Sequence, residues 1–90
     1  MEYPKTITLS SEDIEGNFLD CQDCPIFRCL NRQGYSVGIV SGLGSVGSKE
    51  SHLVVAQYIL EEPYRGCRYL SWAAIRDRGA GIKLVNISRD

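Results

Sequence analysis

An α+β fold is the class that this sequence predicts, with a mostly antiparallel sheet and two helices on one of its faces. Three observations lead to it. Segments with alternating or β-branched residues lie near the start, in the middle and at the far end of the 90-residue chain, and such segments favour strands. Proline and glycine bound two stretches of helical pattern, and no repeat or linker divides the chain. The expected order of elements is therefore β-α-β-β-α-β, in one domain over residues 1–90.

The first third of the chain predicts a strand, a short helical turn and a helix. Residues 5–10 alternate between apolar and polar, as a strand with one wet face does. The acids in residues 12–14 suit the first turn of a short helix capped by the preceding serines. Pro25 then opens the first full helix and Gly34 closes it. The apolar side of this helix is expected to hold Ile26, Phe27, Cys29 and Leu30, and its solvent side Arg28, Asn31 and Arg32.

The remainder predicts two strands, a helix and a last strand. Residues 35–41 favour a strand, and the Gly/Ser-rich residues 41–51 favour a loop. Residues 52–60 suit a strand by propensity and a helix by periodicity, and we favour the strand. After a Glu-Glu-Pro sequence, a second helix is expected over residues 64–78, and a strand over residues 82–88. The inner side of that helix is expected to hold Cys67, Leu70, Ala73 and Ala74.

Composition and charge exclude some classes of function. The net charge is −1, but six acids precede Gly34 and six bases follow Leu60. The basic part is too mild and too mixed to predict nucleic-acid binding, although a dipolar molecule can pair with a charged protein or with its own copy. No apolar run is long enough to span a membrane. The first residues do not form a signal peptide, so we expect a soluble protein of the cytoplasm.

A glycine motif in the middle of the chain raises the question of nucleotide binding. Its glycines follow an apolar run with G-x-G-x-x-G spacing, but the acid and second strand of a dinucleotide site are not in place. The order Ser-Lys also reverses the Lys-Ser/Thr of a P-loop. We expect a hairpin loop, with a weak phosphate site over residues 42–49 as the alternative. The residues of that alternative are Gly42, Gly44, Gly47, Ser48 and Lys49.

The four cysteines allow several interpretations. Without a signal peptide, free thiols are expected rather than disulfides. Cys21 and Cys24 form a C-x-x-C pair, which can hold zinc only if Cys29, Cys67 or His52 completes the site. The simpler interpretation makes Cys29 and Cys67 small core residues. No cofactor is expected, and zinc is the alternative.

The N-terminal motifs resemble a family of short phage and bacterial proteins of unknown function. That family has a first strand, a T-x-E-H-I-x-x-G turn, a C-P-I-A-x-A-L sequence at the start of a helix, a pair of strands, a helix ending in D-x-G and a last strand. Asp13 stands here where the family has the turn histidine, and the usual Pro-Phe-x-Phe ending is missing. The resemblance implies an α+β fold and a phage or prophage setting, and it implies no activity. The chain matches at Ile7, Leu9, Glu12, Ile14, Gly16, Cys24, Pro25, Ile26 and Leu30.

These observations predict a binding protein rather than an enzyme. The chain has a single histidine, His52, and no identifiable nucleophile, base and orienting group. We expect a small phage or mobile-element protein that occupies a surface of a host protein, such as a defence protein, and that can form a homodimer. A nucleotide binder and a zinc-stabilised domain are the alternatives. Aromatic residues and arginine dominate interface hot spots, which singles out Tyr35, Tyr64, Arg65, Arg68 and Trp72.

Overall fold

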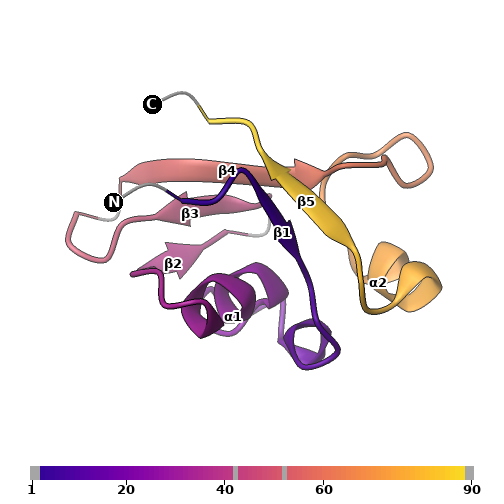
Figure 1. The fold of residues 1–90 in the computed structure, drawn as a ribbon, viewed down its shortest axis with the longest axis horizontal. Coiled ribbons are helices and arrows are strands. Elements are labelled where there is room, and N and C mark those ends of the chain that lie inside the picture. Colours follow the sequence, from indigo (N-terminus) through magenta and orange to yellow (C-terminus); the bar gives the residue numbers. More distant parts are fainter. Residues whose placement is uncertain (1–2, 42, 52, 89–90) are drawn as a thin grey trace.

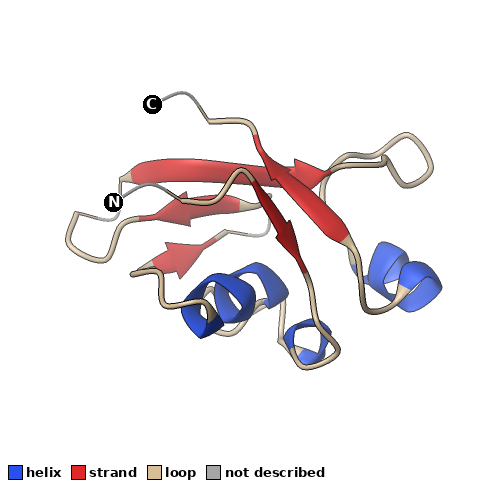
Figure 2. Ribbon diagram, in the orientation of Figure 1, coloured by secondary structure: helices blue, strands red, loops and turns tan. Residues whose placement is uncertain are grey.

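A computed structural model describes residues 3–41, 43–51 and 53–88. These residues form one five-stranded sheet, two α-helices and a 3-10 turn (Figures 1 and 2). The predicted α+β class is confirmed. In chain order the elements are β1 (Thr6–Thr8), η1 (Asp13–Glu15), α1 (Pro25–Arg32), β2 (Ile39–Val40), β3 (Ser45–Gly47), β4 (Val54–Leu60), α2 (Trp72–Arg78) and β5 (Lys83–Asn86).

The sheet has the strand order β1-β5-β4-β3-β2, and every neighbouring pair is antiparallel. Strand β4 is the longest and lies at the centre, where one of its halves pairs with β3 and the other with β5. Alternation along β4 turns Ala56, Tyr58 and Leu60 toward the core, and all three are fully buried. The strand that we favoured over a helix for residues 52–60 is therefore confirmed, while His52 lies outside the described residues.

Both helices cover the same face of the sheet, as predicted. Cys29 and Leu30 of α1 and Ala74 of α2 belong to one apolar cluster with the inward side chains Ile7 and Leu84. The cluster forms a single core between the sheet and the helices. The opposite face of the sheet, called the outer face below, carries the side chains that alternate with the buried ones.

Helix α1 contacts both edge strands of the curled sheet, β1 and β2 (Figure 1). The Cys29 thiol donates to the Thr8 carbonyl over 3.5 Å, and the Val40 amide donates to the Cys21 carbonyl over 2.9 Å. Backbone groups on both edges therefore already have partners, which limits pairing with other chains. Neither described helix has the length and hydropathy of a membrane span.

The expected loop over residues 41–51 is wrong, because it contains the strand β3. Backbone hydrogen bonds connect the chain on both sides of this strand: the Gly44 amide donates to the Ser41 carbonyl and the Ser48 amide to the Leu53 carbonyl. A side chain at Gly44 would place its Cβ 2.2 Å from the Tyr58 carbonyl oxygen, so glycine lets β3 approach β4. The strand over residues 35–41 is shorter than expected, at Ile39–Val40. In this segment glycine therefore indicates a strand whose backbone lies close to its neighbour, in addition to the turns that glycine and serine usually indicate.

The expected helix over residues 64–78 begins only at Trp72. The preceding residues form a hairpin instead, with a bridge between Tyr64 and Cys67. Arg65 and Gly66 have φ angles of 51° and 80°, which suit a two-residue hairpin turn and not a helix. The Ser71 hydroxyl then accepts from the Ala74 amide and caps α2. As a result Cys67, expected in the core, is exposed.

Candidate functional site

The structure brings together three of the five predicted interface residues. Tyr64, Arg65 and Arg68 lie on or beside the hairpin between β4 and α2. Trp72 begins α2, is 51% exposed and contacts the Phe18 ring on the helix-covered side. Tyr35 lies between α1 and β2 and stacks on Tyr3, with ring centroids 5.7 Å apart. The predicted set is therefore not one surface.

Tyr64 fixes the hairpin to α2. Its hydroxyl donates to the Asp77 carboxylate, and the guanidinium carbons of Arg65 and Arg78 each lie 5.4 Å from its ring centroid. Arg78 also donates to the carbonyls of Glu62 and Pro63, over 2.6 and 2.7 Å. The bond to Asp77 raises the pKa of the Tyr64 hydroxyl. Tyr64 is thus half-buried and supports the hairpin, rather than standing free as an anchor.

A shallow groove of about 640 Å³ runs along the outer face of the sheet beside this hairpin. Ile59 forms its floor and is only 6% exposed, while Tyr69 and Ile87 on its walls are 41% and 49% exposed. The Leu60 amide donates to the Arg68 carbonyl over 2.6 Å, which ties this wall to the sheet. Partly exposed apolar walls over a buried floor are typical of ligand and peptide sites. The lining residues are Gln57, Ile59, Gly66, Cys67, Arg68, Tyr69 and Ile87.

Positive charge borders the groove. Arg65 and Arg68 are exposed on the hairpin wall, and Lys83 of β5 lies on the outer face of the sheet beside Thr8. None of the five described strands contains an acidic residue, but Glu61 and Glu62 directly follow β4 where the hairpin begins, and the Glu61 amide donates to the Lys83 carbonyl over 3.0 Å. Arg65 and Arg68, farther along the hairpin, are therefore the charges that favour a ligand joining apolar groups to carboxylates.

Sequence reasoning identified Arg65 and Arg68 but not Tyr69, Ile59 or Ile87. One signal was available. Alternation over residues 82–88 places Ile87 on the side of its strand opposite Leu84, and an apolar residue on the exposed face of a half-buried strand is a candidate contact. Nothing in the sequence shows that residues 66–69 lie beside β4 and border the same groove.

The glycine motif is not gathered into one loop. Gly44 lies before β3 and Ser48–Lys49 after it, so the strand separates them by roughly 13 Å. The Gly47 carbonyl accepts from the Gly38 amide inside the sheet, and is not free to face a phosphate. Gly42 lies outside the described residues. This part of the chain is a meander of β2, β3 and β4, in place of the single hairpin loop that we expected, and it spreads the motif along a strand.

The cysteine pair also has a structural explanation. Cys24 is buried, and its sulfur accepts from the Phe27 amide over 3.4 Å as the N-cap of α1. Burial raises the pKa of the Cys24 thiol, which disfavours the thiolate that zinc needs. Cys21 is exposed. Within residues 3–41, 43–51 and 53–88, no three His, Cys, Asp or Glu side chains gather where a metal ion could bind.

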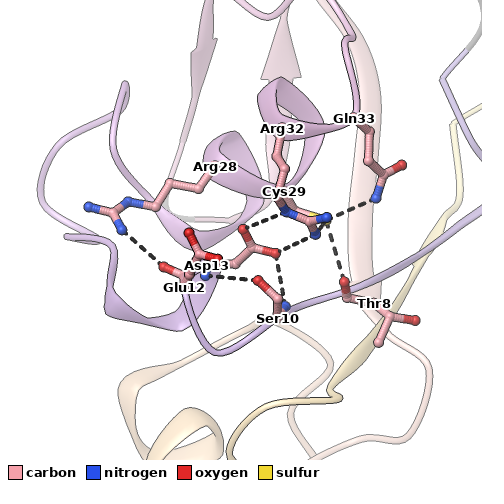
Figure 3. A network of polar contacts seen from close by, with 8 residues as sticks. All are labelled: Thr8, Ser10, Glu12, Asp13, Arg28, Cys29, Arg32 and Gln33. Carbon is pink, nitrogen blue, oxygen red and sulfur yellow. Dashed lines mark hydrogen bonds and ion pairs between the residues drawn. The ribbon is translucent and has the colours of Figure 1, made fainter.

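A polar network that the sequence did not predict joins η1 to α1 (Figure 3). Asp13 is 1% exposed, and its carboxylate accepts from the Ser10 amide and from Arg32, each over 2.9 Å. Arg32 also contacts the Cys29 sulfur, and Arg28 donates to the Glu12 carbonyl. Burial raises the pKa of Asp13, but the bonds from Arg32 and Ser10 outweigh it, so the net pKa lies below its ordinary value of 3.8. All hydrogen bonds of the Asp13 carboxylate are made with Ser10 and Arg32 of the same chain. We therefore assign this network a structural role.

The outer groove is therefore the best candidate for a functional site. It offers apolar contact and positive charge, and its lining residues include no carboxylate or imidazole for acid–base chemistry. Searches of protein families, curated proteins and solved structures found no match to this chain.

Proposed function

We propose that this chain is a small protein-binding protein that uses the groove on the outer face of its sheet. The observation that carries the proposal is the combination of a buried floor at Ile59 with exposed walls at Tyr69 and Ile87. Aromatic and aliphatic side chains in such a setting are the anchors of protein interfaces. The ordered hairpin presents this surface without first having to fold, which reduces the entropy cost of binding.

The proposed ligand is a segment of a partner protein that carries apolar side chains next to carboxylates. Its apolar side chains would cover Ile87 and Tyr69, and its carboxylates would meet Arg68 and Arg65. Long-range attraction to these arginines would speed association and make it sensitive to salt.

The setting of this proposal comes from the resemblance of the N-terminal motifs to short phage and bacterial proteins. On that basis the proposed partner is a host protein in the bacterial cytoplasm, and a defence protein inhibited by occupation of its surface is the specific form of the hypothesis. Nucleic acid is not a proposed partner.

Selection from a displayed library of random peptides tests the groove directly. Peptides enriched on the immobilised protein should combine aromatic or aliphatic residues with Asp or Glu. Their affinity, measured by fluorescence anisotropy, should fall about tenfold or more for Ile87→Ser and for Arg68→Glu. Both residues are exposed, so these variants should fold normally.

Lys49→Glu is the matched control, because it makes the same charge change on an exposed residue at the other end of β4. It should leave peptide affinity unchanged at equal ionic strength. Failure to select any peptide whose binding depends on Ile87, Tyr69 or Arg68 would reject the groove as the binding surface.

A further inference from the structure

A second apolar feature lies on the helix-covered side of the molecule, in the loop between η1 and α1. Leu19 is 92% exposed, although its loop is well bonded internally. The Asn17 side chain accepts from the Leu19 amide over 2.9 Å, and the Asn17 amide donates to the Asp23 carbonyl over 2.9 Å. The loop thus holds a leucine in solvent in a fixed position.

Neighbouring side chains extend this feature into a patch. The Phe18 ring packs edge-on against the half-exposed Trp72 ring, with centroids 4.7 Å apart. We call Phe18, Leu19 and Trp72 the Leu19 patch. Its exposed apolar area is continuous with a loop that contains no basic residue.

Acidic residues flank Leu19 along its loop, while the exposed Arg76 lies one helical turn beyond Trp72 on the α2 side of the patch. Glu15 and Asp20 are exposed, and neither takes part in a salt bridge within the described residues. Asp23 is paired with Arg28 over 2.8 Å. The Asp20 carboxylate accepts a hydrogen bond from the Gln22 amide over 2.9 Å but has no cationic partner among the described residues. The loop therefore presents a leucine beside a carboxylate without a salt bridge, which is the chemistry that the outer groove favours.

We propose that the Leu19 loop of one copy of this chain binds the outer groove of a second copy. This inference rests on the proposed binding function of the groove and names one occupant for it. Leu19 would enter beside Tyr69 and Ile87, and Asp20 would pair with Arg68. The charges are complementary, and the loop is ordered before contact.

The outer groove and the Leu19 loop lie on opposite faces of the sheet, so the loop of one molecule cannot bind the groove of the same molecule. The groove lies on the outer face, and the loop joins η1 and α1 on the helix-covered side. The contact is therefore head-to-tail, and it continues from copy to copy unless a ring closes. A single leucine with its flanking residues buries a small area, so the association is weak.

Sedimentation velocity over a wide range of protein concentration tests this contact. Wild-type protein should form species that grow with concentration and dissociate as salt is added. Leu19→Ser and Arg68→Glu should each lower the association constant about tenfold or more. Both variants change exposed side chains and should keep the wild-type fold. Lys49→Glu should associate like the wild type.

Mixing the two variants tests whether the loop of one copy binds the groove of another, while growth of the wild type beyond a dimer separates the head-to-tail geometry from a two-fold dimer. The loop of Arg68→Glu is intact and the groove of Leu19→Ser is intact, so an equimolar mixture should form a one-to-one complex that grows no further. Wild-type protein that stays monomeric while its groove binds selected peptides would overturn the self-association and leave the groove function standing. Association that persists in Leu19→Ser, or a mixture without the complex, would also overturn it.

Discussion

The turn around Asp13 and the hairpin around Tyr64 each combine a carboxylate with arginines, but in different surroundings. Asp13 is buried, and its three hydrogen bonds from Arg32 and Ser10 dock α1 beside β1. Asp77 is largely exposed and orders a hairpin that borders the groove. Similar side chains thus stabilise the fold in one region and shape a surface in the other. Paired substitutions, one at a site packed against the core and one at the exposed hairpin, can measure this difference as a loss in the free energy of unfolding.

The largest difference is expected between two glycines with positive φ. Gly44→Ala places a methyl group 2.2 Å from the Tyr58 carbonyl oxygen at a φ of 83°, so we expect a loss of about 2–5 kcal/mol in the free energy of unfolding. Gly66→Ala has a similar φ but no atom within 4 Å of the added carbon, and should cost about 1–2 kcal/mol. Urea unfolding measures both. Equal losses would show that φ alone, and not the approach of β3 to β4, sets the cost.

The next difference concerns the carboxylates. Asp13→Ala removes the acceptor of a backbone amide and of Arg32, and should destabilise the protein by about 2–4 kcal/mol. Asp77→Ala breaks exposed contacts only and should cost less than about 1 kcal/mol. The same unfolding experiment checks both variants. A small effect of Asp13→Ala would mean that water replaces its bonds and that the network does not dock α1.

Acid should act mainly on the Asp13 turn. The pKa of Asp13 is lower in the folded protein than the ordinary 3.8, so its contribution is complete above that value and is lost as the pH falls through the folded pKa. The free energy of unfolding should therefore fall as the pH is lowered from about 5 to below 3.8. Asp13→Asn should flatten this dependence. The partly exposed pair of Asp23 and Arg28 should leave a smaller slope in this variant.

The smallest effect is a difference in thiol reactivity that leaves stability unchanged. Burial raises the pKa of Cys29 to about 11, so this thiol should react with a disulfide reagent only after unfolding. Cys67 beside the hairpin and Cys21 are exposed and should react in the folded protein. Counting the released thiolate before and after adding denaturant checks this. Rapid reaction of all four thiols before denaturant is added would show that the helix-covered side of the sheet opens readily.

The two regions also differ in how far the sequence predicts them. Alternation predicted β1 and β5, the first and last strands of the chain, and Pro25 marked the start of α1 correctly. Cys29 was correctly expected in the core. These signals are local, since each depends on residues only a few positions apart in the sequence.

The failures arose where distant segments decide the structure. Arg32 is exposed, as expected, but its ion pair with the buried Asp13 was not predicted, because Asp13 lies 19 positions earlier and no local pattern joins the two. Strand β3 is short and glycine-rich, and it exists because β2 and β4 flank it. The hairpin before α2 could have been found, because glycine at the second position of a two-residue turn favours it. The groove depends on that hairpin, so its prediction failed with it.

The pairing of β1 with β5 has a consequence for synthesis of the chain. Thr6 faces Val85 across the sheet, 79 positions later, so the sheet cannot close until residue 85 has left the ribosome. Until then, the apolar side chains of β1 and β4 lack their shared neighbour. Folding of the whole sheet is therefore expected only once β5 has been translated, and before then chaperones would meet an open sheet that lacks β5.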